Sequence, residues 1–300
     1  MTAKKYALII FIALLIALGF LWSRRTQPAL AVRMLNVGLG ESVLVREPSG
    51  KKILFDGGPN DSVLSELGSI LPAWDSTIDL LILSHDHSDH ITGFIPVLDR
   101  YAVKEIWTSG TTYTSAEYTS FLNQLARHDL KQTTVYFDPL AMCQKQSPCP
   151  PIHTFGTSLL QVYHPLHNAL GEQPKDPHDD TVVVKISYKK TSILLTGDLN
   201  EDHEKAIVRS CLAPNCTLHA TIMQVPHHGS ATGLNRDFLQ AINPSLALIP
   251  VGLNNKFGHP APSTLSKLGQ ARILTYRTDT QGQIHALLWG ESWQVNAAKP

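Results

Sequence analysis

The sequence predicts an α/β sandwich, in which two mixed β-sheets face each other and helices cover their outer faces. The chain has 300 residues, of which 43% are hydrophobic, and this is enough to bury one large core. Its short β-type runs fall into two β-rich halves, and each half also contains helical stretches. Such a pattern packs best as sheet on sheet with the helices outside, rather than as a doubly wound sheet.

An uninterrupted apolar run at residues 6–22 follows Lys4 and Lys5 near the start of the chain. It is long enough to enter a bilayer as a helix, which predicts one N-terminal transmembrane helix rather than a buried core helix. The residues 29–31 resemble a cleavage site, and cleavage would give a secreted protein; however, a cut there would trim the first predicted strand, so we expect an uncleaved anchor. The chain therefore divides into an anchor or signal segment at 1–27 and one folded domain at 28–300.

The folded domain is predicted to consist of short strands and helices between turns rich in Gly, Pro, Asp and Ser. In the first half we expect strands at 31–36, 42–47, 51–56, 79–84 and 103–107, and helices at 62–71 and 115–127. In the second half we expect strands at 181–187, 192–198, 219–225, 245–251, 271–276 and 283–289, and a helix at 202–209. The stretches 140–151 and 165–180, rich in Pro, His and Asp, are interpreted as long loops.

The four cysteines form two close pairs, Cys143 with Cys149 and Cys211 with Cys216, each in a loop that contains proline. This spacing favours two short disulfides over a four-cysteine zinc site, which usually has C-x2-C pairs, and over four buried thiols. Disulfides need an oxidising compartment, so we expect the folded domain to lie outside the cytoplasm, in the periplasm or on the outer face of the membrane.

The charge balance is neutral, because lysine plus arginine and aspartate plus glutamate number 25 each. The chain therefore has no overall positive field that would indicate a nucleic-acid partner. It also has no acidic excess that would indicate disorder. The composition leaves the class of substrate and the oligomeric state open.

The chemistry is concentrated in His85-Asp86-His87-Ser88-Asp89-His90, directly after a predicted strand. Histidines rarely gather like this in a surface loop, and a core histidine usually occurs singly. Alternate residues after a strand end can direct two imidazoles at one metal ion, while the next acid and histidine turn towards a second ion. The motif therefore predicts a binuclear metal site.

On these residues the sequence resembles the metallo-β-lactamase superfamily, and within it the hydrolase domain of ComEC-type DNA-uptake proteins. The resemblance runs from about residue 32 to residue 290. Its motifs are LNVGLGESVLV at 35–45, DGG at 56–58, SHDHSDH at 84–90, LLTGD at 194–198, VPHHGS at 225–230, NKFGHP at 255–260 and YRTDTQG at 276–282. The first motif usually reads VGQGDS, so Leu39 and Glu41 depart from it, and the loss of the polar group at Leu39 puts one substrate contact of the family in doubt.

The resemblance implies two divalent metal ions held in a metallo-β-lactamase fold. The implied ligands are His85 and His87 for one ion, Asp89, His90 and His228 for the other, and Asp198 as the bridge. A buried carboxylate such as Asp198 is costly unless cations compensate it. Zinc suits nitrogen and oxygen ligands in an exported protein, and manganese or iron could use the same ligands.

The adjacent His227 and His228 cannot both point at the metals. We choose His228 as the ligand because similar secreted phosphorylcholine esterases use the second histidine, and we expect His227 to support it or to face the substrate. Asp89, His227 and His259 are the expected catalytic residues. His259, or Ser230, is expected to contact a phosphoryl oxygen or to steady the leaving group.

Asp56 is expected to support the metal loop from below through hydrogen bonds. The β-lactamases carry a further histidine in the middle of the chain, and this sequence has no clear equivalent of it. His178 is interpreted as a solvated loop residue, or at most as a group that supports the ligands. The other spare histidines, His164, His167, His203 and His219, are expected to play no part.

Two bridged metal ions lower the pKa of a shared water, so we expect hydroxide to be the nucleophile in a hydrolysis. The resemblance implies a phosphodiesterase and, as one case, a nuclease acting on DNA at the cell surface. Two alternatives stay open: a hydrolase of another ester class, such as a phosphorylcholine esterase, lactonase or β-lactamase, and a metal-stabilised module without catalysis in a surface complex.

Overall fold

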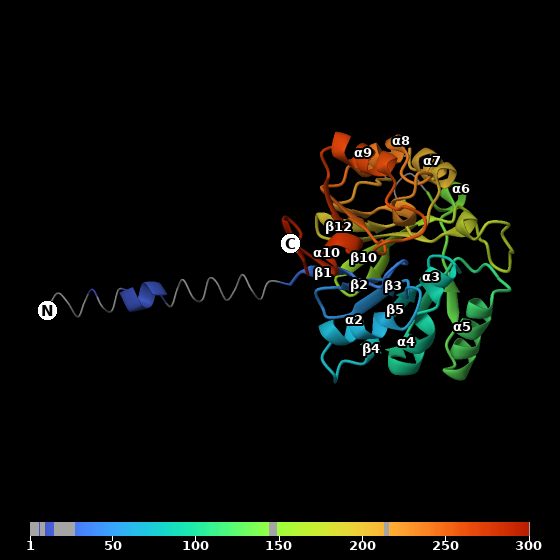
Figure 1. Ribbon diagram of the computed structural model, residues 1–300, viewed down its shortest axis with the longest axis horizontal. Helices are drawn as coiled ribbons and strands as arrows, with labels where there is room; N and C mark the ends of the chain where they lie inside the picture. Colours follow the sequence, from blue (N-terminus) through green and yellow to red (C-terminus); the bar gives the residue numbers. More distant parts are fainter. Residues whose placement is uncertain (1–5, 7–9, 15–27, 144–148, 213–215, 300) are drawn as a thin grey trace.

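The structure, a computed structural model, describes residues 6, 10–14, 28–143, 149–212 and 216–299. Two β-sheets lie at its centre, and helices cover the outer side of each sheet (Figure 1). The predicted sandwich of two mixed sheets is thereby confirmed.

The first sheet contains strands in the order β17-β16-β1-β2-β3-β5-β7-β8. Their bounds are β1 (Leu30–Met34), β2 (Val43–Arg46), β3 (Lys52–Phe55), β5 (Leu80–Ile82), β7 (Ile106–Thr108), β8 (Gln132–Thr134), β16 (Ile284–Leu288) and β17 (Trp293–Ala297). The strands from β17 to β3 pair antiparallel, and those from β3 to β8 pair parallel. A small second ladder pairs β4 (Thr77–Ile78) with β6 (Ala102–Val103).

The second sheet has the order β15-β14-β13-β12-β11-β10-β9. Its strands are β9 (His153–Phe155), β10 (Ser158–His164), β11 (Val183–Tyr188), β12 (Thr191–Leu195), β13 (Ile222–Gln224), β14 (Leu246–Ile249) and β15 (Leu274–Arg277). Antiparallel pairing from β9 to β12 gives way to parallel pairing from β12 to β15. The carboxyl ends of β12, β13 and β14 therefore lie at one edge, where loops can converge.

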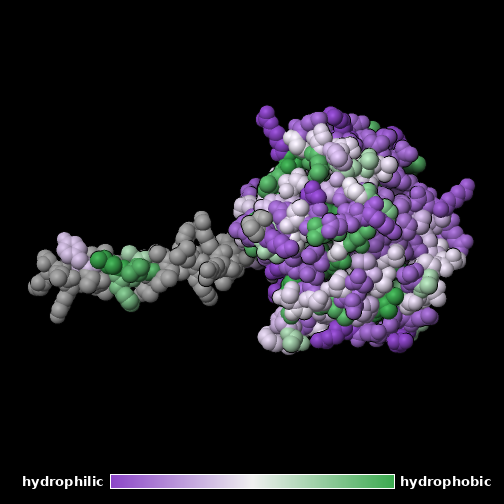
Figure 2. Space-filling model, in the orientation of Figure 1, coloured by the Kyte–Doolittle hydropathy of each residue, from purple (hydrophilic) through white to green (hydrophobic). Residues whose placement is uncertain are grey.

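The main core lies between the two sheets and is built from alternate residues of their strands, such as Val43, Phe55 and Ile82 from one and Val184 and Ile193 from the other. The central strands β3 and β12 are buried at every position, because helices cover their outer faces. On the face shown in Figure 2, hydrophobic side chains form small groups between hydrophilic ones.

The helices lie on the two outer faces of the sandwich. Against the first sheet lie α2 (Ser62–Ile70), α3 (Ser88–Ile91), α4 (Phe94–Arg100) and α5 (Ala116–Arg127), with α6 (Pro139–Met142) nearby in sequence. Against the second lie α7 (Glu201–Ser210), α8 (Arg236–Ile242) and α9 (Pro262–Gln270), while α10 (Thr278–Gln281) follows β15. Each large helix buries one apolar stripe and exposes the other side.

Several elements were not predicted from the sequence: the strands β8, β9, β10 and β17 and the helices α4, α8 and α9. The edge strands β8, β9 and β17 are only partly buried, so they lack the apolar alternation that would indicate a strand. The stretch 165–180 is a loop, as predicted, and it ends in the 3₁₀ turn η1 (Pro177–Asp180).

Most of the predicted membrane segment at 6–22 lies outside the described residues. In the part of the chain that is described, no helix has the length and apolar character needed to span a bilayer.

The two predicted disulfides are confirmed, as Cys143 is joined to Cys149 and Cys211 to Cys216. Cys149 and Cys216 also pair through their backbones in an isolated parallel bridge. Cys149 and Cys216, distant in sequence, therefore lie side by side.

Candidate metal centre

The loop after β5 carries the histidine motif and is held from below by Asp56. One Asp56 oxygen accepts a hydrogen bond from the Ser84 backbone N–H at 2.7 Å. The other accepts from Ser84 Oγ at 2.6 Å and lies 2.7 Å from His90 Nδ1. Asp56 thus occupies the supporting place that the sequence predicts, where it orients the loop and the His90 ring together.

Glycines let the DGG turn pack directly against the motif helix α3. Gly57 N–H donates to the His90 carbonyl at 2.7 Å, and Gly93 N–H donates to the Gly58 carbonyl at 3.0 Å. A Cβ atom at Gly93 would overlap the Gly57 carbonyl, so this approach of two backbones requires glycine.

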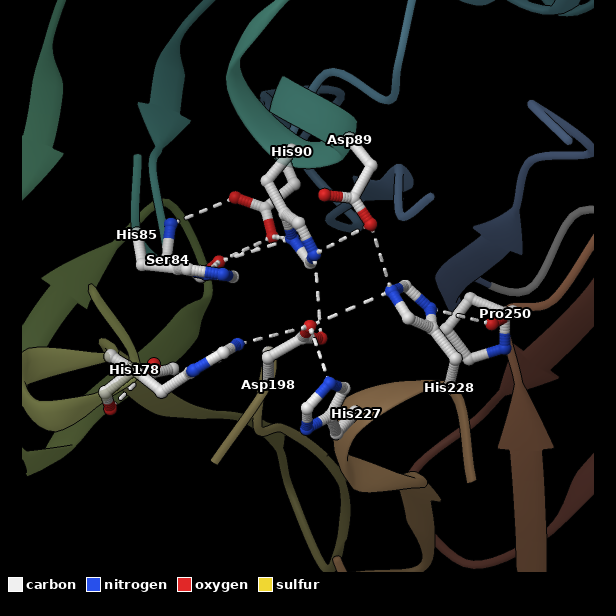
Figure 3. A network of polar contacts seen from close by, with 12 residues as sticks. Ser84, His85, Asp89, His90, His178, Asp198, His227, His228 and Pro250 are labelled. Carbon is white, nitrogen blue, oxygen red and sulfur yellow. Dashed lines mark hydrogen bonds and ion pairs between the residues drawn. The ribbon is translucent and has the colours of Figure 1, made fainter. Parts of the chain in front are cut away.

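Asp198 lies at the centre of the site, in the turn after β12, and is almost completely buried. Its oxygens lie 3.3 Å from His90 Nε2, 3.6 Å from His228 Nε2 and 3.8 Å from His178 Nε2. Figure 3 shows these imidazoles directed at the carboxylate from different elements.

The Asp198 turn is fixed by Gln224, which the sequence analysis did not single out. Gln224 Oε1 accepts hydrogen bonds from the backbone N–H groups of Thr196 at 2.6 Å and Gly197 at 2.9 Å. Its side chain is fully buried at the end of β13. A glutamine inside an otherwise apolar strand was the available signal, because a buried amide needs hydrogen-bond partners.

His228 reaches the site from the turn η2 (Pro226–Gly229), and the carbonyl of Pro250 orients it. His228 Nδ1 donates to this carbonyl at 2.8 Å, so Nε2 is left to face Asp89 Oδ2 at 3.2 Å. His227 and His228 both have left-handed backbone angles, with φ of 50° and 53°. Their side chains consequently point in different directions, and His228, as the sequence analysis chose, is the one enclosed among the acids.

The potential ligand atoms form three groups, of which two share Asp198 and the third joins Glu41, Asp56 and His90. The first consists of His85, His87, His178 and Asp198, and the second of Asp89, His90, Asp198 and His228. In each group the ligand atoms lie within 4.8 Å of one another. The structure therefore brings together all six residues that the sequence analysis proposed as ligands.

His178 requires a correction, because it is not a solvated loop residue but lies among the candidate ligands. Its side chain is only 16% exposed, and its ring lies 5.1 Å from that of His85 and 4.5 Å from that of His87, between centroids. Asp176 caps the turn η1 and holds His178 Nδ1 at 2.6 Å, which directs Nε2 into the site. His178 thus adds a third imidazole to the group that contains His85 and His87.

Four polar atoms in the cluster are buried and have no hydrogen-bond partner among the described residues: His85 Nε2, His90 Nε2, His178 Nε2 and Asp198 Oδ1. Leaving such atoms unpaired is costly, typically about 1–3 kcal/mol each. All four converge on the same small region, so divalent cations would satisfy them together. The donor set of imidazole nitrogens and carboxylate oxygens fits this chemistry.

Charges in the cluster reinforce this arrangement. Burial raises the cost of ionising Asp198, yet the nearby His228 and His90 hold its pKa well below the ordinary value. Burial and the neighbouring His90 hold the pKa of His85 well below its usual range, so its ring stays neutral. A neutral imidazole and an ionised carboxylate are the forms in which these groups bind metals. The neighbouring acids raise the pKa values of His90 and His228, so metal ions would have to displace protons from these two rings.

His227 and His259 line the approach to the ligands. His227 Nε2 lies 3.7 Å from Asp198 Oδ2, and its ring centroid lies 5.9 Å from that of His259. Burial lowers the pKa of His227 to about 4 and also lowers that of His259, so both rings are neutral near pH 7. Ser230 is different, because its hydroxyl bonds within its own loop, accepting from Gly233 N–H at 3.1 Å.

Of the remaining histidines, His164 is buried rather than solvated. Its Nδ1 lies 2.7 Å from the Thr181 carbonyl and its Nε2 lies 3.2 Å from His203 Nδ1. His203 in turn lies 3.3 Å from Asp179, next to His178. These two histidines therefore support the turn that carries His178, a role that the sequence analysis did not foresee.

Comparison with known sequences agrees with this geometry. The profile of the Metallo-beta-lactamase superfamily matches residues 35–252. The chain is 25% identical over 284 residues to "Recombination protein 2" of Haemophilus influenzae, a match covering 93% of this chain and 31% of that protein. It is 26% identical over 273 residues to "ComE operon protein 3" of Bacillus subtilis, a match covering 84% of this chain and 32% of that protein. The predicted resemblance to competence proteins is confirmed, although this chain spans only about a third of their length.

Two solved structures share the fold at low sequence identity. Tm1679, described as a metal-dependent hydrolase of the beta-lactamase superfamily, has a TM-score of 0.51 at 14% identity, covering 85% of this chain and 98% of the other. YhfI from Bacillus subtilis, a metallo-beta-lactamase fold protein, has a TM-score of 0.50 at 13% identity, covering 83% of this chain and 97% of the other. At this identity the likeness establishes the fold alone.

Proposed function

The chain belongs to the metallo-β-lactamase superfamily, and on that premise we propose that it hydrolyses phosphodiesters with two divalent metal ions held around Asp198. Its fold and its His/Asp cluster are those of a metal-dependent hydrolase. The observation that carries the proposal is the pair of ligand groups that share Asp198. A carboxylate that belongs to both groups would allow two ions to be held close together, as hydrolysis with two metals requires.

When bound, the two ions would lower the pKa of a water that attacks phosphorus and would neutralise charge on the phosphoryl oxygens. The residues of the chain then have separate tasks. Asp89, whose side chain is 30% exposed, can orient the attacking water. His227 and His259 are neutral and partly exposed, so each can donate a hydrogen bond to a phosphoryl oxygen or to the leaving group.

Phosphodiesters are favoured over other esters by the relatives, whose names refer to recombination and to the ComE operon. DNA is accordingly the first macromolecular substrate to test. Zinc suits the nitrogen and oxygen ligands, and manganese and iron are the alternatives to include.

The first experiment measures bound metal together with hydrolysis of bis-p-nitrophenyl phosphate and of single-stranded DNA. We expect two metal ions per chain and turnover that a chelator abolishes. Asp198→Ala should lose metal and activity together, whereas His219→Ala, which alters a histidine away from the cluster, should retain both. Metal without turnover of any phosphodiester would refute the proposal and favour a non-catalytic module or another ester class.

We further propose that the domain works outside the cytoplasm, attached to the membrane by residues 6–22. The support is the pair of disulfides, which persist in oxidising compartments. Alkylation of thiols in protein taken from native membranes should label cysteine only after reduction. Labelling of all four cysteines without reductant would contradict this placement.

A further inference from the structure

The loop 252–259 between β14 and α9 ends at His259, whose ring lies 5.9 Å from that of His227 beside the candidate metal centre. Asn255 closes this loop, since its Nδ2 donates to the carbonyls of Gly252 at 3.0 Å and His259 at 2.7 Å. Its Oδ1 accepts from the His259 N–H at 2.9 Å. The backbone of the loop is therefore held in one shape.

Phe257 is 59% exposed on this loop, and its ring stacks on the imidazole of His259. The two centroids lie 5.7 Å apart with 20° between the planes. His259 in turn lies next to His227, which lies 3.7 Å from Asp198. A series of contacts thus leads from the candidate metal ligands to an exposed phenyl ring.

The charge beside the ring indicates the kind of ligand it can take. Lys256 Nζ lies 5.0 Å from the Phe257 ring centroid, and the lysine is exposed. A positive group at this distance repels a cationic ligand such as a quaternary ammonium, but it favours a ligand that carries phosphate. An aromatic face next to a positive charge is the combination with which proteins bind single strands of nucleic acid.

We propose that Phe257 is a base-stacking platform and that Lys256 binds the adjacent phosphate, forming a subsite for a single-stranded polynucleotide beside the metals. This inference rests on the proposed phosphodiesterase function and specifies its substrate class. An incoming base stacks on the phenyl ring, while the flexible Lys256 side chain moves from the ring to the backbone phosphate. His259 keeps the platform in register with the scissile bond. A base inside a duplex offers no free face, so the subsite selects unpaired strands.

Leu253 provides a matched control on the same loop. It is 71% exposed, more than Phe257, yet among the described residues it has no aromatic partner. Removing it takes away a similar amount of exposed apolar surface without altering the stack.

The test is binding of a fluorescent phosphorothioate oligothymidine, which resists cleavage, to the full zinc-loaded chain, followed by fluorescence anisotropy. Phe257→Ala should weaken binding by between about 5-fold and 150-fold, the range that one base–aromatic stack contributes. Phe257→Trp should bind with about the affinity of the wild type, and Leu253→Ala should change the affinity less than about twofold. Lys256→Ala should weaken binding most at low salt and flatten the dependence on salt concentration.

An abasic strand of the same length separates stacking from phosphate contacts. Wild-type protein should bind the abasic strand about as weakly as Phe257→Ala binds the normal strand. The affinity of Phe257→Ala should be only slightly lower for the abasic strand than for the normal strand. Equal affinity of wild type and Phe257→Ala for the normal strand would overturn the subsite even if bis-p-nitrophenyl phosphate is cleaved. Failure to cleave any phosphodiester would instead overturn the proposed function, whatever the binding result.

Discussion

Asp56 connects the backbone of the metal loop to the ring of one candidate ligand. Asp56→Asn would keep one acceptor oxygen for Ser84, but its amide group cannot accept the hydrogen bond from His90 Nδ1. We expect zinc affinity to fall about 10-fold to 100-fold, as measured by competition with a chromophoric chelator. Asp99→Asn, which alters an exposed acid paired with Arg127, serves as the control and should bind zinc normally. Unchanged affinity in Asp56→Asn would contradict the supporting role.

His178 supplies the third imidazole of the first ligand group. His178→Ala should therefore leave the second group intact and retain close to one metal ion per chain where wild type retains two. Metal analysis after dialysis measures this directly. His167→Ala changes a half-exposed histidine in the same loop and should retain the full metal content. Two tightly held ions in His178→Ala would show that His178 is not a ligand.

His164 makes the fold sensitive to acid. Burial lowers its folded-state pKa from 6.5 to about 3, so its stabilising contribution is complete above about pH 6.5 and is lost as the pH falls towards 3. Between pH 7 and pH 5 this group should account for about 2 kcal/mol of lost unfolding free energy. His164→Asn keeps a donor for the Thr181 carbonyl but does not titrate. Urea denaturation of metal-free protein should show a smaller loss for the variant; equal losses would contradict the assignment.

At the scale of single residues, the sequence predicted the residues that are contiguous in motifs and missed those that only the fold brings together. His85, His87, Asp89 and His90 share one strand end, so their spacing alone indicates a metal site. His178 reaches the same place through a loop and a 3₁₀ turn, and nothing in its neighbouring residues indicates where the turn will lie. Gln224 and the His164–His203 pair were missed for the same reason.

Each of the two disulfides closes a short segment of the chain, and Cys149 of one pairs through its backbone with Cys216 of the other. Cys211 ends α7, and its partner lies 5 residues further on. Closing a loop of this size lowers the conformational entropy of the unfolded chain, which stabilises the folded state by about 2 kcal/mol. Replacing Cys211 and Cys216 together by serine should lower the unfolding free energy by that amount in urea denaturation. Under reducing conditions wild type and variant should converge, and a persistent difference would point to packing instead.

Prediction of the elements succeeded where a strand is buried on alternate or on both faces, as in β2, β5 and β12. It failed at the edges, because β8, β9 and β17 are partly exposed and carry mixed residues. The helices α4, α8 and α9 are amphipathic in the structure, but proline or glycine within or next to them disguises the helical period. Packing against the sheets, rather than intrinsic propensity, determines these elements.

At the scale of the whole molecule, the candidate ligands come from both halves of the chain. His85, His87, Asp89 and His90 follow β5 of the first sheet, whereas His178, Asp198 and His228 lie on loops of the second. Bound metal would therefore hold the two sheets together. At metal concentrations about 1,000-fold above its dissociation constant, one ion adds about 4 kcal/mol to the unfolding free energy. Chelation should consequently lower the melting temperature by several degrees, as followed by calorimetry. Identical melting with and without chelator would contradict a metal shared between the halves.

The position of β1 has a consequence for how the chain is made. This strand lies between β2, which follows it directly, and β16, which is synthesised after every strand of the second sheet. Until the C-terminal hairpin of β16 and β17 emerges, one edge of β1 remains open and the first sheet is incomplete. Such a long-range pairing closes slowly, so a partly synthesised chain stays unfolded at this edge. A ribosome stalled before β16 should hold a chain that proteases still digest at β1, whereas release of the full chain should bring protection.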